Sequence, residues 1–192
     1  TSISNKSFEL TILVLNILAQ ALVEGVTNDF VSQVELAISW VKQWINDYEC
    51  KTKNLVDFMD GYTAIDFIAN DASLSVAKQM ALVYREGLHV FTAAWELADY
   101  AHGQYLGAGP GYLAIMLAPN VNDDPVATRM IDVIVKRKGK VILLTSDDFS
   151  ETDDIKVIPM PKLRGSILAL VEAMPTQLLL GMLLGPNWVK GQ

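Results

Sequence analysis

Two kinds of hydrophobic pattern divide the chain. Up to residue 60, apolar residues recur every three or four positions, a spacing typical of helices. This spacing predicts one helix over residues 7–24 and a second over residues 28–46. Side chains that favour the N-cap position lie at the start of both: Ser4 or Asn5 for the first helix, and Asn28 or Asp29 for the second.

After residue 60 the pattern changes to short, continuous apolar runs that alternate with helical segments. Continuous apolar strands are typical of a parallel sheet covered on both faces, so we predict a doubly wound, three-layer α/β fold preceded by helices. Ligands of such folds bind beyond the carboxyl ends of the strands. The predicted strands are 64–69, 111–119, 140–146 and 155–161, and the predicted helices are 74–88, 124–139 and 164–185, the last bent at Pro175.

The same change of pattern predicts the domain organisation. Residues 1–60 are expected to form a helical segment, and residues 61–192 the α/β domain. The chain starts at Thr1 and enters a strongly apolar helix almost at once, although a domain rarely begins with so much hydrophobic surface to cover. We therefore expect it to be a fragment of a longer protein, or half of a duplicated architecture.

Composition narrows the classes of function. The 192 residues are 51% hydrophobic and 19% charged, which argues against intrinsic disorder. The net charge is −7, and no Lys/Arg cluster is larger than residues 136–140, so a general nucleic-acid binder is not expected. On such an acidic protein an anionic ligand must be held by local donors, such as helix N-termini and Ser or Thr hydroxyls.

Cys50 is the only cysteine, so an intramolecular disulfide and a cysteine-based metal site are excluded, and a reducing cytoplasm is the expected location. No signal-peptide pattern is visible. The most apolar stretch, residues 10–25, is interrupted by Asn16, Gln20 and Glu24, so we predict a buried helix there rather than a membrane span.

The candidate chemistry gathers between residues 84 and 106, which hold both histidines of the chain. His102 comes three residues after Asp99. The two side chains could form a pair, or His102 could be a helix-terminal histidine beside an acid, and the spacing leaves both open. His89 is predicted to be buried and hydrogen-bonded. We interpret Glu86 as a solvent-exposed residue at a helix end or as a partner of Arg85. If it faces a pocket instead, its carboxylate would suit proton transfer.

Common catalytic motifs are absent: the sequence holds no GxGxxG, P-loop, HExxH or GxSxG pattern. The glycine-rich residues 107–111 enter a predicted strand instead of leaving one, so we interpret them as a turn. Two histidines without closely spaced carboxylates make a weak metal site. We expect neither a metal nor a cofactor.

Three groups of residues resemble the sugar isomerase (SIS) domain family, in particular the second SIS domain of the glucosamine-6-phosphate synthase isomerase, ketosamine-phosphate deglycase and amino-sugar-phosphate deaminase type. In the central group, His102 comes sixteen positions after Glu86 and Pro119 comes seventeen positions after His102, as in the family. The similar segments are "SISNKSF" (2–8), Arg85–Glu86 with "DYAHG" (99–103) and "IMLAP" (115–119), and "MPTQLLLGMLL" (174–184).

The resemblance implies a function and roles for individual residues. It implies an aldose–ketose isomerase, or a deaminase or deglycase of an amino-sugar phosphate of the fructose 6-phosphate class, acting through an enediol. Glu86 would be the general base and His102 would catalyse ring opening, reaching the site from the neighbouring subunit. Ser4, Lys6 and Lys190 would contact the sugar phosphate. A homodimer is implied, with the Ser/Thr phosphate loop supplied by a first SIS domain that would precede residues 1–60.

Departures from the family pattern keep two alternatives open. Val83 stands where synthase isomerases carry a lysine, Gln104 replaces a proline, and Asp99 replaces a glutamate. The departures at Val83 and Gln104 favour a non-catalytic, sugar-phosphate-binding regulatory module. A third alternative is a structural half-domain with a large exposed apolar face on helix 7–24.

Overall fold

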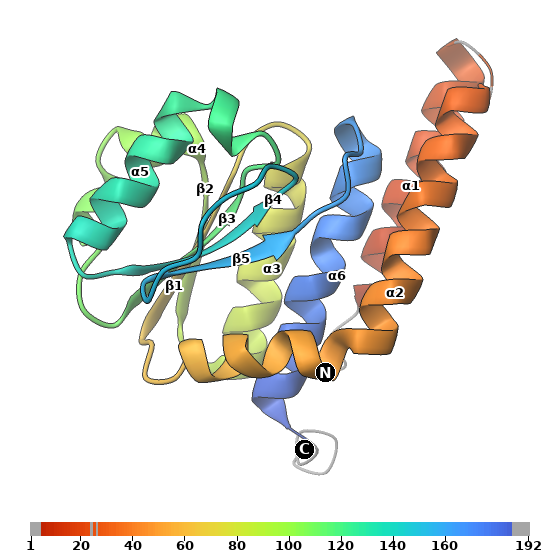
Figure 1. Ribbon diagram of the computed structural model, residues 1–192. Helices are drawn as coiled ribbons and strands as arrows, with labels where there is room; N and C mark the ends of the chain where they lie inside the picture. The colour runs from red at the N-terminus through yellow and green to blue at the C-terminus, as the bar shows by residue number, and fades with distance from the viewer. Residues whose placement is uncertain (1–4, 24, 26, 186–192) are drawn as a thin grey trace.

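The computed structural model describes the backbone of residues 5–23, 25 and 27–185, with side chains from Phe8 onward. Helices and strands alternate after two long N-terminal helices (Figure 1). The helices are α1 (Asn5–Val23), α2 (Asn28–Phe58), α3 (Ser73–Leu88), α4 (Leu97–Ala101), α5 (Pro125–Lys136) and α6 (Gly165–Leu184), with short 3₁₀ helices at Gln104–Gly107 and Val121–Asp123. The strands are β1 (Ala64–Ala69), β2 (Phe91–Glu96), β3 (Tyr112–Leu117), β4 (Lys140–Thr145) and β5 (Ile155–Pro159).

The five strands form one parallel sheet in the order β2-β1-β3-β4-β5. β1 pairs with β2 on one side and with β3 on the other, so that Ala64 lies opposite both Phe91 and Tyr112. The direction of winding therefore reverses between β1 and β3. A parallel sheet in this order, with helices on both faces, confirms the predicted doubly wound α/β fold.

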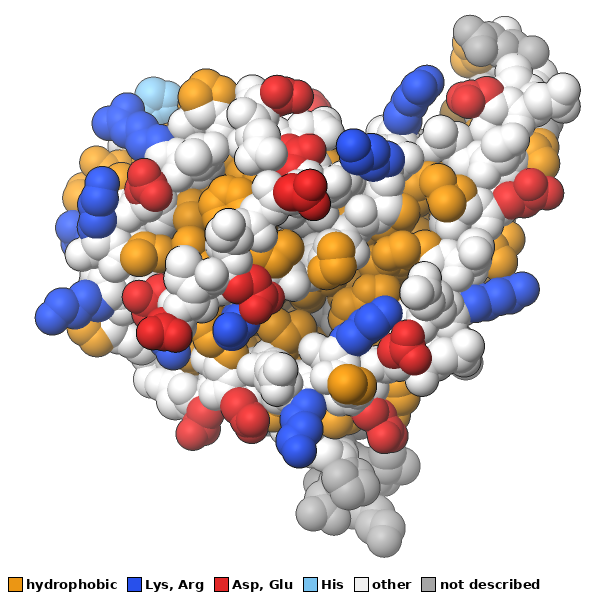
Figure 2. Space-filling view, in the orientation of Figure 1, with side chains coloured by type: hydrophobic (Ala, Val, Ile, Leu, Met, Phe, Trp, Pro, Cys, Tyr) orange, Lys and Arg blue, Asp and Glu red, His pale blue; other side chains and the backbone are white. Residues whose placement is uncertain are grey.

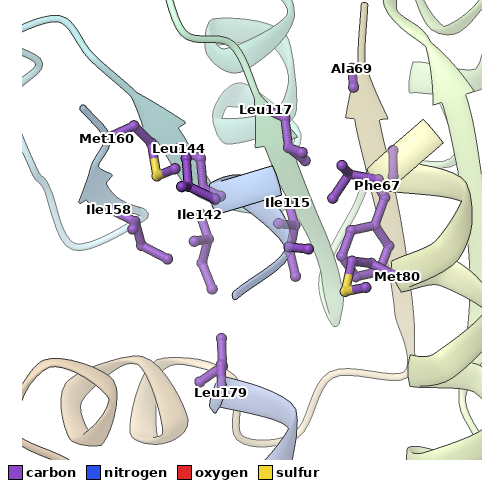
Figure 3. Packing of buried hydrophobic residues seen from close by; sticks show 14 of the residues in the cluster. Phe67, Ala69, Met80, Ile115, Leu117, Ile142, Leu144, Ile158, Met160 and Leu179 are labelled. Atoms are coloured by element: carbon purple, nitrogen blue, oxygen red, sulfur yellow. The ribbon is translucent and has the colours of Figure 1, made fainter. Parts of the chain in front are cut away.

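Side chains from each strand alternate between two hydrophobic cores. One set, including Phe67, Ile115 and Ile142, packs with α3, α6 and α2, and Figure 3 shows these side chains on one side of the sheet with Met80 of α3 and Leu179 of α6. The other set, including Ile68, packs with α4 and α5. Burial on both faces explains why the strands read as continuous apolar runs.

The second helix is longer than predicted, and its cap is one residue earlier. It continues beyond residue 46 to Phe58 because Thr52, Leu55 and Phe58 extend the buried three- and four-residue spacing. The predicted caps Asn28 and Asp29 are wrong: Thr27 is the N-cap, and its hydroxyl accepts a hydrogen bond from the Phe30 N–H at 3.2 Å. Figure 1 shows α1 and α2 side by side, reaching past the sheet.

One strand has no counterpart among the strands predicted from the apolar runs. The sequence of β2, FTAAWE, holds few large aliphatic residues, and only Thr92 in it is buried. As an edge strand it pairs with β1 alone. An edge strand needs less apolar surface than a central one, so its hydrophobic pattern is weak.

The apolar surface of α1 is only partly covered. Leu10, Val14, Leu15 and Leu22 are exposed among the described residues, so the predicted burial of residues 10–25 is wrong for this chain taken alone. The exposed face is the one that the structural half-domain alternative expects. By contrast, α6 runs continuously through Pro175 and is long and apolar enough to cross a membrane. However, 56% of its most apolar 18-residue window is buried inside the protein, as is typical of core helices. Figure 2 shows apolar side chains reaching the surface between scattered acidic and basic groups.

Candidate functional site

A cleft of about 940 Å³ opens at the carboxyl ends of β1, β3 and β4. Its walls come from the loops after these strands, which contribute Asn70, Asn120 and Asp147, and from the segment Lys162–Gly165 that leads into α6. It includes the point between β1 and β3 where the winding reverses. Doubly wound sheets bind their ligands there, because the two neighbouring loops diverge to opposite faces of the sheet.

Three helices begin in the wall of this cleft: α3 at Ser73, α5 at Pro125 and α6 at Gly165. They differ in how their first N–H groups are satisfied. The Asp124 carboxylate caps α5 by accepting from the N–H groups of Val126 and Ala127, both at 3.0 Å. Within the part of the chain that the structure describes, no side chain caps α3 or α6. The N-termini of α3 and α6 therefore keep partial positive charge available to an anion.

Cations lie on the same side of the cleft as these uncapped ends. Lys162 and Arg164 line it just before α6, and both are exposed. The backbone N–H of Arg164 donates to Gln33 Oε1 of α2 at 3.3 Å, which ties the start of α6 to the helical segment. Ser73 adds a hydroxyl at the start of α3.

The other side of the cleft is acidic and rich in acceptors. Asn70 links the end of β1 to two helices, because its amide donates to Asp124 at 3.4 Å and its carbonyl accepts from the Leu97 N–H at 3.3 Å. Asp147 accepts from the Asn122 N–H at 3.0 Å. Carboxylate and amide oxygens at fixed positions are suitable acceptors for ligand hydroxyl groups. The cleft therefore combines uncapped helix N-termini and cations with carboxylate and amide oxygens.

Sequence reasoning did not single out these cleft residues as a site. A signal was present, since "NDAS" and "SDD" follow directly after strands and "NVNDDP" begins three residues after the end of β3. In a parallel sheet, polar residues in those positions converge at one edge. Within the described residues, no group of three His, Cys, Asp or Glu side chains is arranged to hold a metal ion.

The two predicted catalytic residues lie apart in one chain. Glu86 is exposed in the last turn of α3, which runs from the cleft to the amino ends of the strands, and its neighbour Arg85 donates to the carbonyl of Thr92 at the start of β2. His102 is exposed at the C-cap of α4, beyond the carboxyl end of β2. Neither is among the residues that line the cleft. Their catalytic roles stay predictions.

Among the described side chains, the His102 imidazole forms no hydrogen bond or ion pair with Asp99; the backbone N–H of His102 donates to the Asp99 carbonyl at 3.2 Å. The predicted burial of His89 is wrong. His89 is exposed in the left-handed conformation (φ 56°) and ends α3 through its N–H to the Arg85 carbonyl. A helix-ending residue of this kind turns away from the core.

The predicted substrate-binding residues are not tested. Ser4 and Lys190 lie outside the described residues, and of Lys6 only the backbone, in the first turn of α1, is described. Their assignment to the sugar phosphate stays a prediction.

No protein-family model and no curated protein matches this chain. Solved structures do. A glucosamine-6-phosphate deaminase from Thermotoga maritima superposes with a TM-score of 0.69 at 20% identity, over 93% of this chain and 51% of the deaminase. The protein c3406 of Escherichia coli CFT073, in complex with a sugar phosphate, gives 0.63 at 11% identity, over 85% of this chain and 92% of c3406.

The NanR protein of Vibrio vulnificus, complexed with ManNAc-6P, gives a TM-score of 0.63 at 14% identity, over 90% of this chain and 68% of NanR. The chain thus spans about half the length of the deaminase and most of c3406. At these identities the likeness concerns the fold. Together with the strand order, it shows that the chain has a SIS-like fold.

Proposed function

We propose that the chain binds a sugar phosphate in the cleft at the carboxyl edge of the sheet. One observation carries the proposal: the uncapped N-termini of α3 and α6, with Lys162 and Arg164, face an acceptor-rich side formed by Asn70, Asp124 and Asp147 within one cavity. A phosphate fits the first side, and sugar hydroxyls fit the second. The sugar-phosphate complexes of c3406 and of NanR support this assignment.

The proposed reaction is an aldose–ketose isomerisation, or the removal of an amine from an amino-sugar phosphate, through an enediol. A base must carry a proton between neighbouring carbons, and a second group must protonate the ring oxygen. Glu86 and His102 are our candidates for these tasks. Because the cleft, Glu86 and His102 do not share one surface of a chain, we propose that a homodimer or a further SIS domain completes the site.

The test is binding and turnover with fructose 6-phosphate, glucosamine 6-phosphate and a fructosamine 6-phosphate. We expect calorimetric binding of at least one compound, turnover by the wild type, and a loss of turnover in Glu86→Gln of about 10²-fold or more. Glu35→Gln, an exposed change on α2, is the matched control. If Glu86→Gln turns substrate over like the wild type, the assigned base is wrong.

The alternative is a non-catalytic module that binds a sugar phosphate. The placement of Glu86 and His102 outside the cleft favours it. It predicts binding of a phosphosugar without conversion at any protein concentration. Binding with conversion rules it out.

A further inference from the structure

A carboxylic acid without a partner lies inside the protein next to the cleft. Glu172 of α6 is 0% exposed, and neither of its carboxyl oxygens has a hydrogen-bond partner among the described residues. It lies one helical turn after Leu168, which lines the cleft. Buried polar groups in native proteins are almost always hydrogen-bonded, so an exception calls for an explanation.

The start of α3 provides the polar neighbour of Glu172. α3 packs against α6, and its first residue, Ser73, is 6% exposed in the wall of the cleft. Burial raises the pKa of Glu172 to about 7, and the nearby Ser73 hydroxyl lowers that pKa. Ser73 therefore stands between a buried acid and the ligand cavity.

Among the side chains that the structure describes, those packed against α6 near Glu172 are mostly uncharged. Tyr84 of α3 donates its hydroxyl to the Thr176 carbonyl at 2.7 Å, and Glu9 of α1 faces Gln177. The residues that α2 buries carry no ionisable group. Asp71 and Arg164 are charged groups that line the neighbouring cleft. Burial is the main cause of the raised pKa of Glu172, and Ser73 opposes it.

The two states of the acid place the Ser73 proton differently. A neutral carboxyl group can donate to the Ser73 oxygen, which leaves the serine O–H free to donate into the cleft. An ionised carboxylate can only accept hydrogen bonds. The Ser73 hydroxyl then donates to Glu172 and no longer into the cleft. Ionisation would also put a negative charge in a poorly solvated position below the anion-binding side.

We propose that Glu172 is a positioning residue that acts through Ser73: as the neutral acid it directs the serine hydroxyl toward an anionic oxygen of the ligand, and on ionisation it withdraws that donor. This inference rests on the proposed anion site in the cleft. It makes ligand affinity dependent on pH in the physiological range.

Binding of glucose 6-sulfate between pH 5.5 and 8.5 tests the inference, with fructose 6-phosphate as the second probe. A phosphate ester titrates near pH 6 and would confuse the profile, whereas a sulfate ester keeps one charge throughout this range. Calorimetry of the full chain should show the affinity of the wild type falling about fivefold to tenfold from pH 6 to pH 8, as expected for one lost hydrogen bond.

Two variants and a control complete the experiment. Glu172→Gln, neutral at every pH, should keep an affinity that does not change with pH. Ser73→Ala should bind more weakly and with no pH dependence, which provides a second test should Glu172→Gln fail to fold. Glu35→Gln, exposed on α2, should follow the wild type.

The possible results separate this inference from the proposed function. If the wild type binds but has no pH dependence, or if Glu172→Gln or Ser73→Ala keeps the wild-type profile, the role of Glu172 is refuted and the anion site stands. If neither probe binds at any pH, both proposals fail.

Discussion

Two carboxylic acids are buried on opposite faces of the sheet, and their surroundings differ. Asp66 of β1 lies on the α4–α5 side, where its Oδ2 accepts from the Tyr112 hydroxyl at 2.9 Å, and Tyr112 in turn contacts the Tyr100 hydroxyl at 2.8 Å. Glu172 lies on the α3–α6 side without a hydrogen-bond partner among the described residues. Burial raises the pKa of both; several neighbours, Tyr112 first among them, oppose the effect at Asp66, whereas Ser73 opposes it at Glu172.

The difference separates a structural acid from a candidate functional one. Oδ2 of Asp66 accepts from Tyr112 of β3, whose hydroxyl also contacts that of Tyr100 in α4, so this oxygen has a hydrogen-bond partner within the fold. Glu172 retains unused hydrogen-bonding capacity directly behind a cleft residue. Folding alone would favour an apolar residue at position 172, because an unsatisfied buried acid lowers stability.

The largest expected effect is on stability at alkaline pH. The folded-state pKa of Glu172, about 7, exceeds the ordinary value of 4.5, so stability is present below pH 4.5, is lost as pH rises toward 7 and stays reduced above it. Glu172→Gln should therefore raise the free energy of unfolding at pH 8 by up to about 3 kcal/mol relative to its effect at pH 4.5. Urea denaturation at both pH values measures this. If the free energy of unfolding changes by the same amount between the two pH values in variant and wild type, the prediction is contradicted.

A smaller loss is expected when the satisfied acid loses its donor. Tyr112→Phe removes the hydrogen bond to Asp66 and that of Tyr100, so the free energy of unfolding should fall by about 2 kcal/mol. Tyr105→Phe, a half-buried change outside this chain of hydroxyls, is the control and should have little effect. Equal stabilities of the two variants in urea would show that the network contributes nothing.

The next largest effect on stability is expected from removal of the carboxylate that caps α5. Asp124→Ala leaves the first N–H groups of α5 without their acceptor, and we expect a loss of about 1 kcal/mol by thermal or urea unfolding. Asp123→Ala, one residue earlier and exposed, should be nearly neutral. Matching losses in both variants would point to charge rather than capping.

The exposed acid should matter least for folding. Glu86 is open to solvent, so Glu86→Gln should change the free energy of unfolding by less than about 0.5 kcal/mol. Any loss of turnover in this variant would then reflect chemistry. A large loss of stability would instead place Glu86 in a structural role.

The central strands and the layer arrangement could be predicted from sequence because Ile, Val and Leu in β1, β3 and β4 carry a strong local signal. The edge strand β2 lacks that signal, since few of its side chains are buried. The cap at Thr27 was missed because three neighbouring residues, 27–29, all favour that position, and the chain geometry decides between them.

The site was harder to predict than the fold. A spacing of sixteen residues does not say at which edge of the sheet each residue lies, and Glu86 and His102 lie beyond opposite ends of β2. The environment of Glu172 depends on packing between α3 and α6. In the chain, 76 residues lie between the end of α3 at Leu88 and the start of α6 at Gly165. Local sequence patterns do not predict such long-range packing.

The length of α3 has a kinetic consequence. At about 1.5 Å per residue, thirteen residues place Glu86 some 20 Å from Ser73, farther than one sugar phosphate can reach. Catalysis that used both the cleft and Glu86 would therefore take place between two polypeptide units. If those units are separate chains, turnover per molecule should fall on dilution below their dissociation constant, whereas occupancy of the cleft at a given ligand concentration should not.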